Sequence, residues 1–217
     1  MSGAAARYDA WYHTARGAWI GEREFALLTR ALAPRPGETL LDVGCGTGHF
    51  TRLFAERARV GVVGLDPSFD SLSFAAVHRT AGEDYVAGRG QRLPFRDASF
   101  DLTIAVTSLC FIRAQEEALR EIVRVTRRRL ALGLLNRRSL LYLQKGRGGG
   151  AGAYRGALWH TAREVRALFQ RMPVRDLRLA SAIFLPGGGP AARAAEALLP
   201  RVCPAGGFLL AAADVSR

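Results

Sequence analysis

The clearest pattern of apolar and polar positions lies between residues 40 and 54. Residues 40–43 (Leu-Leu-Asp-Val) form a short apolar run that predicts a buried strand. Glycine then occupies every second position from Gly44 to Gly48, so this turn can adopt positive φ and let a ligand approach its backbone. Apolar residues follow at 50, 53 and 54, which is helical spacing. The pattern predicts a strand, a binding turn and a helix, the first part of a nucleotide-binding α/β unit.

Strand-like and helix-like patterns alternate along the following chain. Further buried strands are predicted at residues 60–65, 84–87, 102–109 and 130–135. In the helix after the second strand, Phe69, Leu72 and Ala76 are expected to share the buried face. Another amphipathic helix is expected to end near Thr126, with a turn at Arg127–Arg129 before the fifth strand. Such alternation is typical of a parallel sheet covered on both faces.

The two ends of the chain show different patterns. Before the first strand, Phe25, Leu28 and Leu32 fall on one helical face, and the aromatic stretch ahead of them is either a lid or an extra helix. After the fifth strand we expect a short helix at residues 140–143, a glycine-rich stretch at 146–156 and a capping box from Thr161 to Glu164. Two final strands are predicted at residues 177–185 and 208–215, which brings the total to seven.

Composition and charge narrow the class of protein. The formal charge of +12 raises the possibility of a nucleic-acid partner, but only Lys145 among the 31 basic residues is a lysine, and the arginines are spread along the chain. The one local concentration runs from Arg127 to Arg147. Nucleic acid is therefore not the partner we expect.

Cysteine, histidine and hydropathy patterns exclude several other classes. The three cysteines contain no Cys-x-x-Cys pair, which favours reduced thiols and predicts no metal site. The first residues, Met1 to Gly17, lack the apolar core of a signal peptide, and the longest nearly apolar run, Leu102 to Ile112, is too short to span a bilayer. We expect a cytoplasmic protein, and nothing in the sequence predicts its oligomeric state.

Two carboxylates indicate which ligand the glycine turn binds. The dinucleotide fingerprint G-x-G-x-x-G fails in both registers, because its third glycine would be His49 or Thr51. Asp42, two positions before the first glycine, would repel a pyrophosphate but suits a cationic ligand. Asp66 ends the second strand, about where an acid accepts hydrogen bonds from ribose hydroxyls. S-adenosylmethionine has a ribose, an ammonium and a sulfonium, and it has no phosphate.

Four motifs in order carry a resemblance to a known family. They are the stretches Leu40–Gly48, Val63–Ser68, Leu93–Asp101 and Ala118–Val125. In order and spacing they resemble class I S-adenosylmethionine-dependent methyltransferases, and most of all the methyltransferase-11 type that includes ubiquinone and menaquinone methyltransferases. The resemblance implies a three-layer, Rossmann-like, mostly parallel sheet of seven strands with an antiparallel last strand. It also implies methyl transfer, here expected on a small-molecule acceptor.

The resemblance also implies roles for particular residues. The glycine turn would meet the methionine part of the cofactor, Asp66 the ribose, and the loop from Gly88 to Leu93 the adenine. With Thr107, whose strand-end position suits a cofactor contact or an ordinary strand threonine, the candidate cofactor-binding residues are Asp42, Gly44, Cys45, Gly46, Gly48, Asp66, Pro67, Gly90, Gln91 and Thr107. We expect one methyltransferase domain over residues 1–217, with a helical lid at 1–36 and an acceptor site shaped by 136–217.

The sequence departs from the family at two places that bear on chemistry. Relatives commonly carry an acid where this chain has Arg89, so the adenine is expected to be held near Gly90 and Gln91. A histidine pair common after the fourth strand is replaced by Cys110-Phe111. No catalytic residue is assigned, and the candidate bases by residue type alone are Tyr12, His13, Tyr154 and His160.

Three alternative functions stay open at this point. An RNA methyltransferase would use the arginines between 127 and 147, and a non-catalytic S-adenosylmethionine-binding protein would account for the departures. A nicotinamide oxidoreductase is disfavoured by Asp42 and the broken fingerprint. Asp66 has its own alternative, as a cap for the helix that begins near Phe69.

Overall fold

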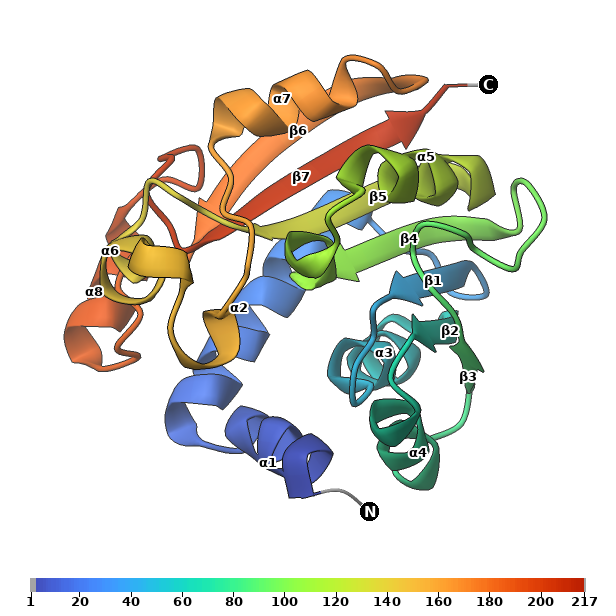
Figure 1. The fold of residues 1–217 in the computed structure, drawn as a ribbon, viewed down its shortest axis with the longest axis horizontal. Helices are drawn as coiled ribbons and strands as arrows, with labels where there is room; N and C mark the ends of the chain where they lie inside the picture. The colour runs from blue at the N-terminus through green and yellow to red at the C-terminus, as the bar shows by residue number, and fades with distance from the viewer. Residues whose placement is uncertain (1–2, 217) are drawn as a thin grey trace.

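A seven-stranded sheet in the order β3-β2-β1-β4-β5-β7-β6 forms the centre of the computed structural model (Figure 1). The model describes residues 3–216, so the predictions for Met1, Ser2 and Arg217 lie outside the described residues. The strands are β1 (Thr39–Val43), β2 (Gly61–Asp66), β3 (Glu83–Ala87), β4 (Phe100–Val106), β5 (Thr126–Leu135), β6 (Val174–Ala182) and β7 (Phe208–Val215). Pairs from β3 to β5 are parallel, whereas β7 runs antiparallel to both β5 and β6. The predicted fold class is confirmed.

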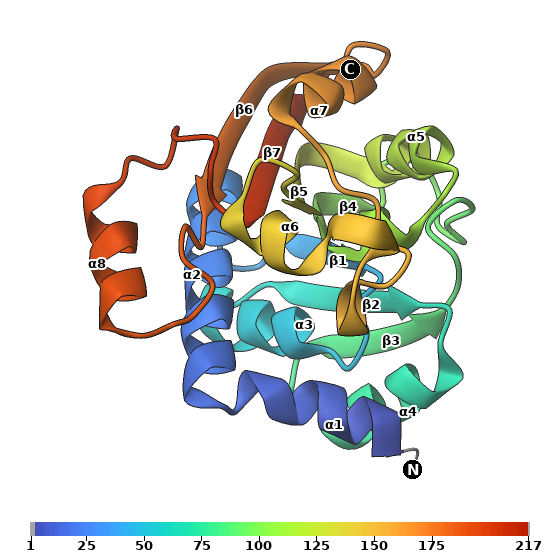
Figure 2. The same ribbon diagram turned by 60° about the vertical axis from the view of Figure 1, so that its left-hand side comes forward.

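Helices lie on both faces of this sheet (Figure 2). They are α1 (Gly3–Tyr12), α2 (Ala15–Leu32), α3 (His49–Leu53), α4 (Phe69–Val77), α5 (Gln115–Val125), α6 (Leu140–Lys145), α7 (Ala162–Phe169) and α8 (Pro190–Leu198). α3 continues into a π-helical turn, η1 (Phe54–Ala58), and three short 3₁₀ turns follow later, η2 (Ser108–Phe111), η3 (Arg147–Gly149) and η4 (Gly152–Tyr154). One apolar cluster joins α2, α3 and α8 to the sheet, and a second joins α5, α6 and α7 to its other face.

Side chains of β1 point alternately to the two faces of the sheet, so this strand contributes to both apolar clusters. Leu40 packs into the cluster under α2, while Leu41 and Val43 pack into the cluster under α5, and all three are fully buried. Successive side chains of a strand point to opposite faces, so a central strand with apolar residues on both sides must be covered twice. This places β1, and the turn after it, in the middle of the molecule.

Several boundaries and faces differ from the sequence predictions. β4 ends at Val106 rather than at residue 109, because the backbone turns at Thr107 with φ of 57°. α5 ends at Val125 and β5 begins at the next residue, so the turn expected at Arg127–Arg129 is absent. β6 spans Val174–Ala182, three residues earlier than predicted.

The buried face of α4 was also predicted wrongly. Phe69 is 78% exposed and Ala76 is exposed too, whereas Leu72, Phe74 and Ala75 are buried. Ser68 caps this helix, so Phe69 is its first residue and lies in the exposed first turn. The short helix α6 and the capping box of Thr161 and Glu164 are confirmed.

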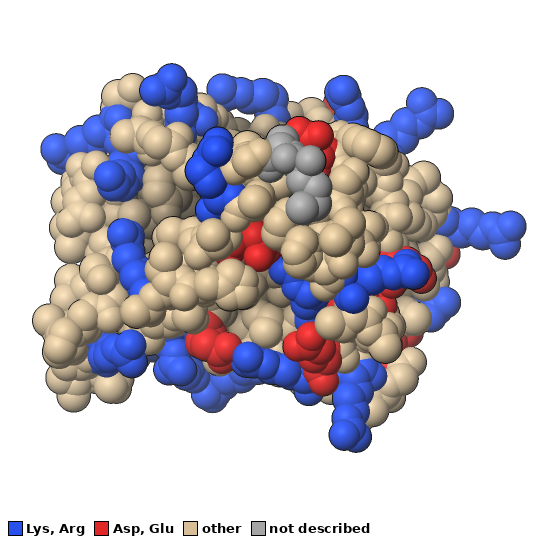
Figure 3. All heavy atoms as spheres, turned by 90° about the horizontal axis from the view of Figure 1, so that it is seen from below, with Lys and Arg blue, Asp and Glu red and all other residues tan. Residues whose placement is uncertain are grey.

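The arginines do not form a continuous basic surface on the face shown in Figure 3. Basic side chains are scattered over the face shown in Figure 3 and separated by uncharged and acidic residues. Those of the predicted concentration are largely paired, as in Arg127–Asp101, Arg128–Glu38, Arg129–Asp214 and Arg137–Glu164. Within residues 3–216, no helix has the length and apolar character needed to cross a membrane.

Candidate functional site

The glycine turn is tied to the carboxyl end of the neighbouring strand. The amides of Gly44 and Cys45 both donate to the carbonyl oxygen of Leu65, at 2.6 and 3.1 Å. Gly44, Gly46 and Gly48 all have positive φ, the backbone region in which other residues are strained. The turn therefore lies at the carboxyl ends of β1 and β2, where open α/β sheets bind ligands.

Asp66 holds this turn in place from the end of β2. Its Oδ2 accepts a hydrogen bond from the Gly46 amide at 2.9 Å, and its Oδ1 accepts one from the Ser68 amide at 2.8 Å. The helix-cap alternative is wrong, because the side chain of Ser68 accepts from the Ser71 amide and caps α4. Each carboxylate oxygen keeps a further lone pair, so Asp66 can also accept hydrogen bonds from a ligand.

Asp42 is a second, more deeply buried carboxylate at the same end of the sheet. It is 2% exposed and accepts a hydrogen bond from the Thr51 hydroxyl at 2.8 Å. Burial raises the pKa of Asp42 to about 7, the Thr51 bond opposes the rise, and the charge of Asp66 adds to it. A cation bound in the turn would favour the ionised form of this carboxyl group.

Ser108 is a site residue that the sequence analysis missed. Its hydroxyl donates to the carbonyl oxygen of Val43 at 2.5 Å, and a Cβ added to Gly44 would lie 2.2 Å from the Ser108 Cβ. Thr107, the predicted contact just before it, has φ of 57°, which is unusual for a β-branched residue. The turn after β4 is thus strained and packed directly against the glycine turn.

The remaining candidate residues lie near the glycine turn at the carboxyl end of the sheet, and they differ in how far they are exposed. The Gly88 amide donates to the Asp66 carbonyl oxygen at 3.1 Å, and this brings the predicted adenine loop beside β2. In that loop Gly90 is buried, and a Cβ on it would lie 3.1 Å from side-chain carbons of both Val43 and Ile112. Gln91 is partly exposed.

Two further candidates, Pro67 and Cys45, lie in or beside the glycine turn. Pro67 is exposed beside Asp66, where it leads the chain toward α4. Cys45 is half-buried, and burial raises the pKa of its thiol, so this sulfur is not poised as a nucleophile.

Aromatic residues of α1 lie over the glycine turn, where Tyr8 and Tyr12 line a cavity together with Gly44 and Gly46. The Tyr12 ring stacks on His49 with a centroid distance of 3.6 Å, and the Tyr12 hydroxyl lies 3.5 Å from that of Tyr8. Asp9 of α1 forms an ion pair with Arg52 of α3 at 2.8 Å, and Arg52 also donates to the Thr47 carbonyl oxygen at 2.7 Å.

Only a small cavity, about 30 Å³, remains beneath α1. It is lined by Tyr8, Tyr12, Asp42, Gly44, Cys45, Gly46, His49, Phe50 and Val106. Two buried polar atoms in the turn, Thr47 Oγ1 and His49 Nε2, have no hydrogen-bond partner among the described residues. Burial lowers the pKa of His49 to about 4, with the charge of Arg52 adding to the effect, so its ring is neutral.

These features fit a nucleoside cofactor with a cationic tail. The turn offers bare backbone at its three glycines, two unpartnered side-chain atoms, and the neighbouring carboxylates of Asp42 and Asp66. Among residues 3–216, no group of three His, Cys, Asp or Glu side chains could hold a metal ion. The donor set therefore favours an organic cation at this site.

The four candidate bases do not all lie in this region. His13 pairs with Asp9 and its side chain is 77% exposed. His160 is buried beside Gln115, with 2.9 Å between its Nε2 and the Gln115 side-chain nitrogen, and it pairs with Asn136 just after β5. Tyr12 lies over the glycine turn, and Tyr154 lies in η4.

Comparison with known proteins agrees with this geometry. Residues 41–130 match the family model described as "Methyltransferase domain". Malonyl-[acyl-carrier protein] O-methyltransferase of Serratia marcescens is 36% identical over 127 residues, 58% of this chain and 47% of the relative. Demethylmenaquinone methyltransferase of Renibacterium salmoninarum is 36% identical over 101 residues, 46% of this chain and 42% of the relative. The chain thus spans about half the length of these curated relatives.

A solved structure extends the likeness to nearly the whole fold. An S-adenosylmethionine-dependent methyltransferase from Thermotoga maritima, described as a possible histamine N-methyltransferase, aligns with a TM-score of 0.74 at 21% identity. The alignment covers 96% of this chain and 94% of that one. At this identity the likeness establishes the fold, including the parts outside residues 41–130.

Proposed function

Because this chain belongs to the class I S-adenosylmethionine-dependent methyltransferases, as its motifs predict, we propose that it methylates a small-molecule acceptor. The observation that carries this proposal is the convergence of Asp42 and Asp66 on the glycine turn at the carboxyl end of the sheet. Asp66 would hold the ribose through its free lone pairs, and Asp42 would balance the positive charge of the cofactor. When bound, the cofactor supplies a methyl group on a sulfonium.

The residues of the chain contribute positioning and exclusion of water. Gly44, Gly46 and Gly48 would present bare backbone to the methionine part, with Cys45 contributing its amide group, while Gly90 and Gln91 would flank the adenine. Pro67 and Thr107 would lie at the edge of the site, where they set the direction in which the chain leaves β2 and β4. Holding two reactants in line supplies most of the acceleration that methyl transfer needs.

The two ends of the chain would build the rest of the active site. We propose that residues 1–36 form a lid, since α1 already lies on the glycine turn. Residues 136–217 would shape the acceptor site within a single domain. A small-molecule acceptor is supported over RNA, since most arginines between 127 and 137 are paired with carboxylates.

Calorimetric titration with S-adenosylhomocysteine tests the proposed cofactor. Wild type should bind it, and Asp66→Ala should weaken binding about tenfold, or about 1.4 kcal/mol, because the ribose acceptor is lost. Asp70→Ala is the matched control, since this acid lies in the first turn of α4 and is exposed. Wild type that binds NADH and not S-adenosylhomocysteine would overturn the proposal. A metabolite screen with a labelled methyl donor then identifies the acceptor.

A further inference from the structure

The outer side of α8 is mostly apolar, whereas a surface helix normally exposes charged and polar side chains. In Figures 1 and 2, α8 lies at the edge of the molecule with no other element outside it. Its inward residue Ala192 packs into the apolar cluster under α2. The exposed residues of the helix are Pro190, Ala191, Arg193, Ala194, Ala197 and Leu198. Only one of these six is charged, while both exposed residues of α5, Glu117 and Arg120, are charged.

The apolar surface continues beyond the end of the helix. Leu198 is 82% exposed, Val202 is 79% exposed and Leu199 is 41% exposed. The Cys203 amide donates to the Pro200 carbonyl oxygen at 2.8 Å, so the chain turns here and Val202 stays close to the helix end. A single exposed leucine is ordinary, but three large apolar side chains within five residues form a patch that marks an interaction site.

The charges around this patch are positive. Glu196 is the only acid between residues 183 and 207, and it is turned inward, where its Oε2 accepts hydrogen bonds from the amides of Ile183 and Phe184 at 2.9 and 3.3 Å. Arg193 and Arg201 are exposed, and neither forms an ion pair within residues 3–216.

A third arginine lies at the other end of the helix. A Cβ on Gly188, just before α8, would lie 3.2 Å from Cγ of Arg16, whose side chain is exposed and is likewise unpaired in the described part of the chain. We call the exposed residues of α8, the stretch from Leu199 to Val202, and Arg16 the α8 surface. It combines an apolar centre with arginines at both ends.

This combination is suited to an anionic lipid bilayer. Apolar side chains of an interfacial helix enter the boundary between headgroups and acyl chains, and flanking arginines contact the headgroups. A second copy of the chain is a poorer match, because both copies carry a formal charge of +12 and would bring the same arginines together. We propose that the α8 surface docks on anionic lipid bilayers. The inference goes beyond the proposed function and does not depend on it.

The size of the patch predicts reversible, peripheral binding. Three large apolar side chains bury little area compared with a spanning helix, and each arginine near an anionic surface strengthens binding about fivefold. Affinity should therefore rise with the fraction of anionic lipid and fall as the salt concentration is raised.

Co-sedimentation with vesicles tests the apolar part of the surface. The vesicles contain phosphatidylcholine alone, or phosphatidylcholine with about 30% phosphatidylglycerol. Wild type should bind the anionic vesicles at least about tenfold more tightly than the neutral ones, and Leu198→Ser/Val202→Ser should weaken that binding about tenfold. Phe69→Ser/Val77→Ser on α4 is the matched control, because these side chains are 78% and 69% exposed. Its affinity should stay within about twofold of wild type.

The charged part needs its own pair of variants, because the whole chain is basic. Arg193→Gln/Arg201→Gln should weaken binding to anionic vesicles at least about tenfold and reduce its salt dependence. Arg163→Gln/Arg166→Gln on α7 removes two exposed arginines elsewhere and should stay within about twofold of wild type. All the substituted side chains are exposed, so unchanged melting temperatures will show that each variant is folded.

Three results would overturn the inference. Wild type that binds neither kind of vesicle has no lipid-docking surface. Control variants that lose as much affinity as the α8 variants would show that the chain binds lipid through its overall charge or apolar character. A concentration-dependent dimer in sedimentation velocity, abolished by Leu198→Ser/Val202→Ser and accompanied by no vesicle binding, would assign the α8 surface to a second copy.

Discussion

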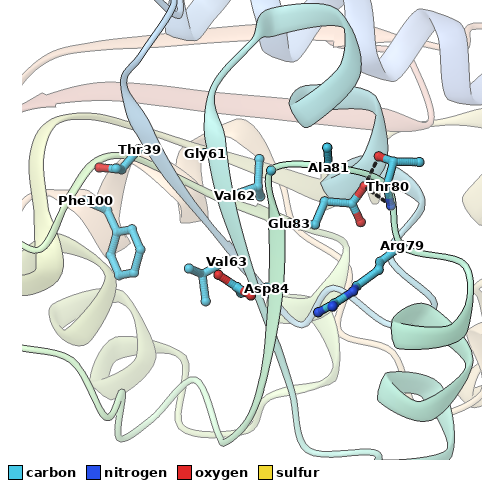
Figure 4. A pocket seen from close by; sticks show the side chains of 11 residues that line it. Thr39, Gly61, Val62, Val63, Arg79, Thr80, Ala81, Glu83, Asp84 and Phe100 are labelled. Atoms are coloured by element: carbon cyan, nitrogen blue, oxygen red, sulfur yellow. Dashed lines mark hydrogen bonds between the residues drawn. The ribbon is translucent and has the colours of Figure 1, made fainter.

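The two ends of the sheet differ in the size of their cavities and in the state of their polar groups. At the amino end, an open groove of about 660 Å³ lies beside the starts of β1, β2 and β3, lined by Thr39, Gly61, Val62, Val63, Arg79, Thr80, Ala81, Gly82, Glu83, Asp84 and Phe100 (Figure 4). At the carboxyl end the cavity measures about 30 Å³. By volume alone, the groove would be taken as the ligand site.

The polar groups indicate the opposite. In the groove, Glu83 accepts hydrogen bonds from both the amide and the hydroxyl of Thr80 (Figure 4). The Thr39 amide and hydroxyl both donate to Asp101. At the carboxyl end, Thr47 Oγ1 and His49 Nε2 are buried without partners. Because buried polar groups are normally paired, the unpaired Nε2 of His49, a residue that lines the small cavity, favours a polar ligand there. The volume of the groove reflects a part of the sheet that no helix covers. The unpaired polar atoms at the carboxyl end indicate where a ligand would bind.

The largest difference between the two ends should appear when glycine is replaced by alanine. Gly44→Ala puts a Cβ 2.2 Å from the Ser108 Cβ at φ of +76°, so the turn must move. We expect a loss of about 2–4 kcal/mol in the free energy of unfolding and no measurable binding of S-adenosylhomocysteine. Urea denaturation and calorimetry measure the two effects.

Gly61→Ala is the matched control at the amino end. Gly61 lines the groove, its φ is not positive, and a Cβ there meets nothing within 4 Å. The free energy of unfolding should change by no more than about 0.5 kcal/mol, and cofactor affinity should stay within twofold. Equal losses in both variants would mean that the glycine turn has no special role.

A second difference concerns the pH dependence of stability. The pKa of Asp42 rises from 3.8 to about 7 on folding, so between these values the folded state holds more protons than the unfolded chain. The free energy of unfolding from this group is therefore highest near pH 4 and falls as the pH rises to 7. Glu24 adds a parallel fall between pH 4.5 and about 8.

Asp42→Asn should reduce the decrease in the free energy of unfolding that Asp42 causes between about pH 4 and 7. Denaturation curves of the apoprotein from pH 4 to 8 measure the slope for each variant. Saturating S-adenosylhomocysteine should reduce the fall in wild type, because its ammonium favours the ionised carboxylate. An unchanged slope in Asp42→Asn would show that this carboxyl group does not titrate in that range.

The central part of the chain could be predicted well because its signals are local. The run from Leu40 to Gly48 specifies strand and turn within nine residues, and Asp66 follows directly on a second apolar run. Rules for open α/β sheets then place these residues at one edge. Together with the motifs that follow in order, up to Val125, this local pattern indicates the family, the fold and the cofactor.

The rest of the site depends on contacts between distant segments. Ser108 reaches the Val43 carbonyl across 65 positions, and nothing in its own neighbourhood marks it. Tyr12 lies on a helix with no marked periodicity, and its stacking on His49 appears only when α1 is placed against α3. The predicted face of α4 was wrong because Ser68 caps this helix, and Phe69 in its first turn is exposed while Leu72, Phe74 and Ala75 are buried. The open groove likewise arises because no helix connects β3 to β4.

The smallest expected effect is on the rates of cofactor binding, and it tests why the cavity at the glycine turn is smaller than the groove at the amino end. A cavity of about 30 Å³ holds little more than a water molecule, whereas cofactor pockets are typically about 300 Å³ or larger, so α1 must move before a cofactor binds. Asp9→Asn removes the charge that pairs with Arg52 of α3 and should raise the association and dissociation rates of S-adenosylhomocysteine several-fold, with a smaller change in Kd. Stopped-flow fluorescence of Trp11 and Trp19 measures both rates. His13→Ala, which removes the exposed second partner of Asp9, should leave them unchanged. Rates that are equal in Asp9→Asn and wild type would mean that the ion pair does not hold α1 over the turn, and the small volume would then reflect side-chain packing of Tyr8 and Tyr12 rather than a closed lid.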